Sequence, residues 1–357
     1  MKQFSAARLG AAVWLMVLVF AGCDQLHSLF SRDGMTGGQT LTVMSYNVEN
    51  LFDAVSDGDE YPEYDPVNGF WDAAGYHLRL SRLRDVINGL PGEGPDIILF
   101  QEIEHEGVLH DLVQWYLRDA GYDFRAATSV SGSAIEVGVI SRFPIEEIIF
   151  HSGQIGPHRA PRPVMETIFT TPWGNLHVFN GHWKSKIGGA ETTQMRRTAS
   201  SLVIRNRTAE IRREDRDAYI VVGGDLNETP WESDDYETAL RRYGYHDHLP
   251  HHRSLLLTAD KDLVSSAKGI FYSPWLEPEG LNMEGTYLYR GNWEAIDHLM
   301  VCENFFSGEG LEYCRSWIVT EGLLDEFGGP KSWNLFARTG ISDHLPMIIH
   351  GKVMDGY

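Results

Sequence analysis

The feature that most constrains the fold of this chain is the order of its apolar runs and helical repeats. Strand-like runs at 41–46 and 96–100 alternate with helical periodicity over 77–90 and 108–120. A long helical stretch at 191–213 precedes one more apolar run. The remaining strand-like runs, at 134–141, 145–150, 163–170 and 175–180, follow one another too closely for crossover helices, so antiparallel pairing is expected among them.

This pattern predicts mixed sheets covered by helices, in two halves with no linker between them. Residues 253–285 carry Gly, Pro and few periodic signals, so we expect a long excursion near the functional face.

The charge of the chain limits the classes of partner. There are 50 acidic and 30 basic side chains among 357 residues, a formal net charge of −20. This balance excludes a simple basic nucleic-acid coat protein, and any attraction of polyanions has to be local. The hydrophobic content of 43% is ordinary for a globular protein with a sizeable core.

The first 22 residues have the pattern of an export signal. Lys2 and Arg8 precede an apolar run at 11–20 that is too short to span a bilayer comfortably. The sequence Phe20-Ala21-Gly22-Cys23 resembles the lipobox of bacterial lipoproteins, in which the cysteine is lipidated after cleavage. An uncleaved anchor or a buried N-terminal helix is the alternative.

With a lipidated Cys23, residues 23–39 are a polar, glycine-bearing tether. The protein is then expected in the bacterial cell envelope, anchored to a membrane by lipid and facing the periplasm or the exterior. Cys302 and Cys314 are either a disulfide or two separate thiols.

Polar clusters follow the predicted strands. Each one alone has a structural explanation, because Asp and Asn at strand ends commonly bond their own backbone in turns. Together they supply oxygen ligands for a hard cation such as Mg²⁺, and histidines and amides for proton transfer and phosphoryl binding. These are the groups that hydrolysis of a phosphodiester requires. The clusters are Ser45–Asn50, Phe100–Glu102, Asn180–Lys186, Val222–Pro230, and the pair Ile296–His298 with Ile341–Pro346.

In this order the clusters resemble the endonuclease/exonuclease/phosphatase superfamily, whose members share the deoxyribonuclease I-like fold. The most specific motifs are 224–227 (Gly-Asp-Leu-Asn) and 342–344 (Ser-Asp-His), supported by Gln101-Glu102 and Tyr46-Asn47. The resemblance implies a four-layer α/β/β/α sandwich of two mixed, largely antiparallel sheets flanked by helices. It favours a single domain over 40–357, and we expect a monomer.

The resemblance also implies roles for individual residues. Asn47 and Glu102 are expected to hold the metal, Mg²⁺ or Mn²⁺ in its place, with Asp343 serving the same ion or a second one. His344, oriented by Asp297, is the expected general base or electrostatic partner.

The remaining roles concern water, the phosphate and the leaving group. Asp225 is expected to position or deprotonate water, Asn227 to donate to a phosphate oxygen, and His182 to act at the leaving group. Arg162, Lys184 and Lys186 are candidate phosphate contacts, with exposed surface as the alternative. For His298, packing is the preferred interpretation.

Three functions are compatible with these residues. The first is a metal-dependent nuclease that acts on extracellular DNA or RNA. The second is a phospholipid-directed phosphodiesterase, similar to bacterial sphingomyelinases, with the apolar residues of 270–276 as a lipid contact. The third is a catalytically silent surface-binding lipoprotein, which the filled catalytic positions make the least attractive.

Overall fold

The computed structural model describes residues 40–232, 255–266 and 269–354. The predicted signal peptide (1–22), the tether (23–39) and the lipidation site Cys23 lie outside these residues. Residues from Thr40 onward form one compact unit. Within the described ranges, no helix is both long and apolar enough to cross a bilayer.

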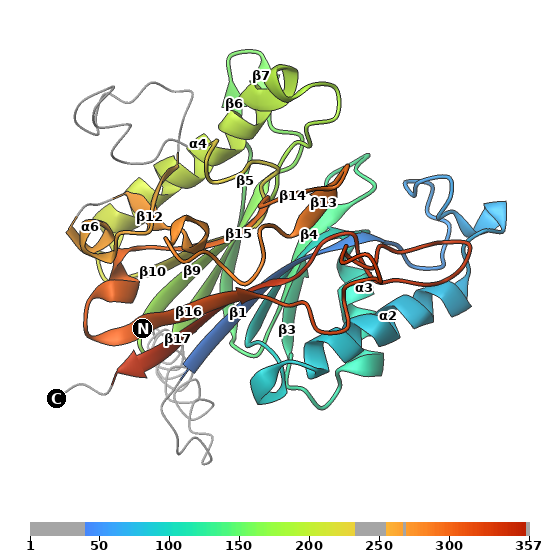
Figure 1. The fold of residues 1–357 in the computed structure, drawn as a ribbon, viewed down its shortest axis with the longest axis horizontal. Helices are drawn as coiled ribbons and strands as arrows, with labels where there is room; N and C mark the ends of the chain where they lie inside the picture. The colour runs from blue at the N-terminus through green and yellow to red at the C-terminus, as the bar shows by residue number, and fades with distance from the viewer. Residues whose placement is uncertain (1–39, 233–254, 267–268, 355–357) are drawn as a thin grey trace, which may run out of the picture. The chain divides into compact units, whose positions relative to one another are not determined.

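Two sheets packed face to face form the core of this unit (Figure 1). The first sheet has the strand order β16 (Gly310–Ile318), β17 (Met347–Met354), β1 (Thr40–Leu51), β2 (Ile97–Ile103), β4 (Glu136–Ser141) and β3 (Phe124–Ala127). The second has the order β11 (Leu256–Thr258), β12 (Ile270–Tyr272), β15 (Asp297–Val301), β10 (Tyr219–Asp225), β9 (Gly174–His182), β8 (Val164–Thr171) and β5 (Ile145–His151).

Both sheets are mixed. β1 with β2, β9 with β10 and β11 with β12 are parallel, and the other pairs in the two sheets are antiparallel. The antiparallel pairing predicted for the closely spaced runs is confirmed for three of the four: β5 pairs with β8, and β8 with β9. The fourth run, 134–141, forms β4 in the first sheet and is antiparallel to β2 and β3 instead. The central strands are buried along their whole length, which is why they read as continuous apolar runs.

Helices cover the outer face of each sheet, which confirms the predicted α/β sandwich. α2 (Ala73–Asn88) and α3 (Glu106–Asp111) lie on the side of the first sheet. α4 (Ala190–Glu214) and α6 (Lys261–Ser266) lie on the side of the second. α2 begins after Asp72, whose carboxylate caps the helix by accepting from the Gly75 N–H at 2.9 Å.

Two small hairpins lie outside the two large sheets. β6 (Gln154–Ile155) pairs with β7 (His158–Arg159) next to α4, and β13 (Tyr287–Tyr289) pairs with β14 (Asn292–Glu294). Short 3₁₀ turns cover Pro66–Asn68, Pro274–Leu276 and Glu303–Phe306.

The prediction of a long irregular excursion over 253–285 is wrong for its described part. This stretch contributes β11 and β12 to an edge of the second sheet, with α6 between them. Ile270, Phe271 and Tyr272 are buried in β12, and the buried Trp275 donates its Nε1–H to the Asp297 carbonyl at 3.0 Å. These side chains pack the core, so they cannot form the lipid contact expected for 270–276.

The two cysteines outside the N-terminal segment are free thiols. Cys302 is buried and its sulfur accepts from the Ile220 N–H at 3.1 Å, whereas Cys314 is exposed on β16. Of the two alternatives, the structure therefore has separate thiols and no disulfide.

Candidate active site

Three neighbouring strands of the second sheet place His182, Asp225 and Asp297 side by side. Asp225, the last residue of β10, pairs with His182 at the end of the parallel strand β9. On its other side it pairs with Asp297, the first residue of the antiparallel strand β15. The register of the sheet therefore puts one imidazole and two carboxylates at a single edge.

The first sheet adds Asn47 and Glu102 to the same edge. The Asn47 side-chain amide donates to Glu102 Oε1 and to Asp225 Oδ2, each at 3.1 Å, and so connects the two sheets. Glu102 has a φ of 64° at an irregularity in the pairing of β2. A left-handed conformation is uncommon for a residue with a side chain, and it is concentrated at functional sites.

His344 approaches this edge from the loop before β17. Its Nδ1 lies 2.7 Å from Asp297 Oδ2, which also accepts from the Thr286 hydroxyl at 2.6 Å. The ring of Tyr287 stacks on the imidazole with centroids 4.7 Å apart. Burial alone would lower the pKa of His344, but the Asp297 carboxylate outweighs it and holds the pKa well above its usual value.

His182 is the electrostatic opposite of His344. Its Nε2 lies 3.6 Å from Asp225 Oδ2 and 3.7 Å from Glu102 Oε1, distances too long for good hydrogen bonds. Burial lowers the pKa of His182 well below its usual value, and the positive charge of Arg162 lowers it further. The surroundings therefore favour the protonated form of His344 and the neutral form of His182.

The surroundings of Asp225 disfavour its ionised form. Burial, followed by the negative charge of Asp297, raises the pKa of Asp225 to about 7. Both Asn227 donors hold Asp225 Oδ1, the backbone N–H at 3.0 Å and the amide at 2.9 Å. The same amide also donates to the Trp183 carbonyl at 3.3 Å. In this structure Asn227 thus supports Asp225, and its amide is not free for the phosphate contact that the resemblance implied.

The donor set of this edge fits a hard divalent cation. Two groups of side chains have ligand atoms close enough to share an ion, one of Glu102, His182 and Asp225 and one of Asp225, Asp297 and His344. Burial raises the pKa of Glu102, and a cation would favour its ionised form again. Asp297 Oδ1 is buried without a hydrogen-bond partner among the described residues, which leaves one ligand oxygen available.

The metal ligands expected from the sequence are near one another here. Asn47 Oδ1 accepts the Glu49 N–H at 3.0 Å and keeps a second lone pair. Asp343 is half-buried, and its negative charge raises the pKa of Glu102. Asn47 and Glu102 are in direct contact, with Asp225 next to them, and the part of Asp343 in holding an ion stays a prediction.

The three candidate phosphate contacts differ in their surroundings. The charge of Arg162 acts on both Glu102 and His182, and its Nε is buried with no hydrogen-bond partner among the described residues. Lys184 lies against Ser185, with Nζ 3.0 Å from the hydroxyl. Lys186 forms ion pairs with Glu232 at 3.1 Å and Glu294 at 3.7 Å, so its charge is already balanced. For His298 the packing interpretation holds, because the buried ring bonds the Glu228 carbonyl at 2.8 Å.

Sequence reasoning assigned no role to several polar groups around the site. Burial, together with the nearby Asp343, raises the pKa of Glu49 to about 7. Deeper in the core, Gln101 Nε2 donates to Asn180 Oδ1 at 2.8 Å and ties the sheets together behind the catalytic edge. Both residues lie inside polar clusters that the sequence displays, but nothing in the sequence separates a buried tie from a catalytic group.

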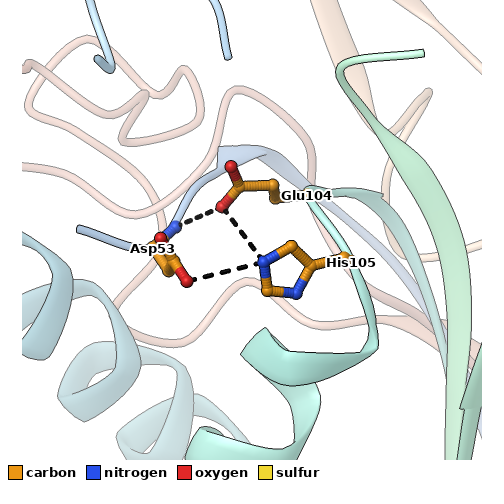
Figure 2. Close-up of side chains that lie close together, drawn as sticks. All are labelled: Asp53, Glu104 and His105. Atoms are coloured by element: carbon orange, nitrogen blue, oxygen red, sulfur yellow. Dashed lines mark hydrogen bonds and ion pairs between the residues drawn. The ribbon is translucent and has the colours of Figure 1, made fainter. Parts of the chain in front are cut away.

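A second carboxylate–imidazole cluster lies just beyond β1 and β2. Figure 2 shows Asp53, Glu104 and His105 with His105 Nε2 pointing toward both carboxylates. The distances from that nitrogen are 3.5 Å to Asp53 Oδ2 and 3.9 Å to Glu104 Oε2. Burial raises the pKa of Glu104 to about 7. The other ring nitrogen of His105 accepts from the Gly107 N–H at 3.0 Å, so this ring caps α3.

The fold and the catalytic edge define a deoxyribonuclease I-like protein of the class that hydrolyses phosphoester bonds. The sequence matches the model of the Endonuclease/Exonuclease/phosphatase family over residues 42–352, and the chain belongs to that family. A sequence comparison with curated proteins finds no significant match.

Solved structures share the fold at low sequence identity. Truncated TDP2 from Caenorhabditis elegans is 13% identical with a TM-score of 0.54, and the match covers 88% of this chain and 98% of that one. D. rerio TDP2 in complex with a single-strand DNA product is 14% identical, with a TM-score of 0.53 and coverages of 88% and 99%. A family protein from Bacteroides thetaiotaomicron is 15% identical, with a TM-score of 0.50 and coverages of 89% and 100%.

Proposed function

We propose that this protein is a metal-dependent phosphodiester hydrolase of the bacterial cell envelope that cuts extracellular DNA or RNA. The observation that carries the proposal is the amide of Asn47, which holds Glu102 of one sheet and Asp225 of the other at 3.1 Å each. This contact brings residues from distant parts of the chain together at one edge of the two sheets.

The side chains divide the chemistry of hydrolysis among them. Asp225 accepts the proton of the attacking water, because its raised pKa makes it a better base than an ordinary carboxylate. Protonated His344, held by Asp297, stabilises the charge that develops on the phosphoryl oxygens.

His182, Arg162 and the ion have the remaining roles in the reaction. Neutral His182 assists the leaving group, and Arg162 neutralises the incoming phosphate. A divalent cation held by Asn47, Glu102 and Asp343 supplies Lewis acidity at the phosphorus when bound.

Three observations support nucleic acid as the substrate, and the first of them argues against phospholipid. The apolar side chains of 270–276 that were candidates for lipid contact are largely buried. A solved structure with the same fold, D. rerio TDP2, contains a single-strand DNA product. Basic side chains at the site, Arg162 and Lys184, supply the local positive charge that a net charge of −20 requires.

Supercoiled plasmid, an RNA transcript and sphingomyelin vesicles, each with Mg²⁺, Mn²⁺ or EDTA, test the proposal. We expect nicking of the plasmid or degradation of the RNA with either metal and none with EDTA. The Glu102→Gln variant is the matched negative control. Intact nucleic acids alongside rapid sphingomyelin hydrolysis would overturn the proposal.

The envelope location is tested separately. We expect the wild-type chain to take up labelled fatty acid and to fractionate with membranes, and a Cys23→Ser variant to do neither. A wild-type chain that remains unlabelled in a lipoprotein-producing host would contradict the lipid anchor.

A further inference from the structure

A groove beside the catalytic site has an unusual composition for this acidic chain. It has a volume of about 520 Å³, within the roughly 300–1,000 Å³ range of ligand sites. Its lining includes Arg159 and Arg196 but no acidic side chain. Three other clefts formed by described residues carry carboxylates, such as Asp85 and Glu321 in one and Asp119 in another.

Both arginines of the groove are available for a ligand. Arg159 ends the hairpin strand β7, and Arg196 is exposed in the second turn of α4. Within the described parts of the chain, neither guanidinium has a hydrogen bond or an ion pair. The protein as a whole has 20 more acidic than basic groups, and so repels anions. The unpaired guanidinium groups of Arg159 and Arg196 make this groove a local surface that attracts them.

The groove also offers an aromatic face. Phe150, at the end of β5, is 50% exposed and lines the groove. The buried hydroxyl residue Thr128 and the rigid Pro161 and Pro163 form other parts of the wall. Cations that follow a backbone, together with an exposed ring on which a base can stack, are the features by which proteins hold single-stranded nucleic acid.

Arg162 links the groove to the catalytic edge, because its neighbours Pro161 and Pro163 line the groove. Arg162, between the two groove prolines, acts electrostatically on Glu102 and His182 in the site. Burial lowers the pKa of Lys184, and the charges of Arg162 and Arg196 lower it further. Arg162 and the groove residue Arg196 therefore both act on Lys184, two residues after His182.

The hairpin that carries Arg159 is fixed in place. The Ala160 N–H donates to the Gly153 carbonyl at 2.9 Å and closes the base of the hairpin. Gly153 lies so close to α4 that a Cβ there would overlap the carbonyl oxygen of Ala199. The position of Arg159 relative to Arg196 is therefore determined by packing, and the groove is built before any ligand arrives.

We propose that this groove binds the single-stranded segment of nucleic acid next to the scissile phosphate, with Arg159 and Arg196 on its phosphates and Phe150 stacked on a base. The inference rests on the proposed nuclease function and adds to it a preference for unpaired strands.

Steady-state kinetics with a single-stranded oligonucleotide and with bis(p-nitrophenyl) phosphate test this subsite. The small diester occupies only the catalytic edge. For the Arg159→Ala/Arg196→Ala variant we expect KM for the oligonucleotide to rise about tenfold. The slope of log(1/KM) against the logarithm of the salt concentration should become less steep by about 0.7 for each arginine removed. Hydrolysis of the small diester is expected to stay unchanged. The matched control is Arg213→Ala, which removes an exposed arginine from the other end of α4.

Phe150→Ala tests the stacking separately, with Phe150→Tyr as the variant that keeps the ring. We expect about a fivefold or greater loss in kcat/KM for the oligonucleotide with Ala and near wild-type values with Tyr. Arginine variants that behave like Arg213→Ala, in an enzyme that cuts oligonucleotides, would overturn the groove and leave the nuclease function standing. A wild-type enzyme that cleaves the small diester and no nucleic acid would overturn both.

Discussion

Two carboxylate–histidine clusters lie in the same sheet and behave in opposite ways. In the first, Glu166 of β8 is completely buried and bonds His151 at 2.6 Å, His177 at 2.7 Å and Arg207 at 2.9 Å. Burial alone would raise the pKa of Glu166, but these hydrogen bonds outweigh it and lower the pKa to about 2.

The cluster at the catalytic edge, with Asp225, Asp297 and His182, has the same residue types, but hydrogen bonds there do not offset the effect of burial. The pKa of Asp225 rises to about 7, and Asp297 Oδ1 and His182 Nδ1 are buried without partners among the described residues. The difference shows that satisfaction of hydrogen bonds, and not the presence of Asp, Glu or His, separates a structural cluster from a reactive one.

Removal of the principal metal ligand is expected to have the largest effect on the reactive cluster. Glu102→Gln should lower kcat/KM at least about 1,000-fold, because a bound cation supplies several kcal/mol of transition-state stabilisation. Calorimetric titration with Mn²⁺ should show binding to the wild type and not to this variant. Equal metal affinity in the two proteins would remove Glu102 from the metal site.

Loss of the charged imidazole is expected to be next in size. His344→Ala should lower kcat/KM about 100-fold or more with the fold retained, since correctly placed proton-transfer groups contribute at least that much. Circular dichroism and a thermal melt check the fold. The matched variant His151→Ala removes an imidazole from the structural cluster and should leave kcat/KM of the folded protein unchanged. Similar losses of kcat/KM in both variants would contradict the division into a structural and a catalytic cluster.

Substitution of Glu166 in the structural cluster should lower the free energy of unfolding and leave the activity of the folded protein nearly unchanged. Glu166→Gln should cost about 3–5 kcal/mol of unfolding free energy near neutral pH, because it breaks a buried ion pair. The exposed Glu147→Gln should change it by less than about 0.5 kcal/mol. Urea unfolding provides the measurement, and kcat/KM of the folded Glu166→Gln protein should stay within about twofold of wild type.

The same variant has a defined pH dependence. The pKa of Glu166 is about 2 in the folded protein against 4.5 for an ordinary Glu, so its contribution is complete above pH 4.5. That contribution is lost as the pH falls from 4.5 toward 2, where both states bind the proton. The stability gap between wild type and Glu166→Gln should therefore narrow over this range and remain constant above it.

The smallest effect concerns the pH profile of the reaction. Asp225 accepts a proton only when ionised, so kcat/KM at saturating metal should rise with pH and level off at or below about pH 7. The midpoint lies below the metal-free value because a cation favours the ionised carboxylate. Rates that fall steadily from pH 5 to 7 would exclude Asp225 as the proton acceptor.

Much of the fold and part of the site follow from local sequence. Continuous apolar runs identified β2 and β10 as buried strands, helical periodicity over 77–90 identified α2, and the long helical stretch at 191–213 corresponds to α4. Polar residues directly after such runs, Glu102 and Asp225 above all, were found because strand ends in α/β folds are where chemistry is placed. The apolar 270–276 segment was misjudged because the sequence does not show which apolar surface is covered.

The sequence by itself indicated many of the strands and helices, and the polar groups that follow the apolar runs, because these depend on neighbours a few positions apart. Only the tertiary structure decided that Asn47 bonds Asp225 across 178 positions, that Glu166 bonds two imidazoles and a guanidinium, and that Arg159 and Arg196 line one groove. The physical reason is that burial and partner distance, which set pKa and reactivity, arise from the packing of two sheets and from no single segment of either.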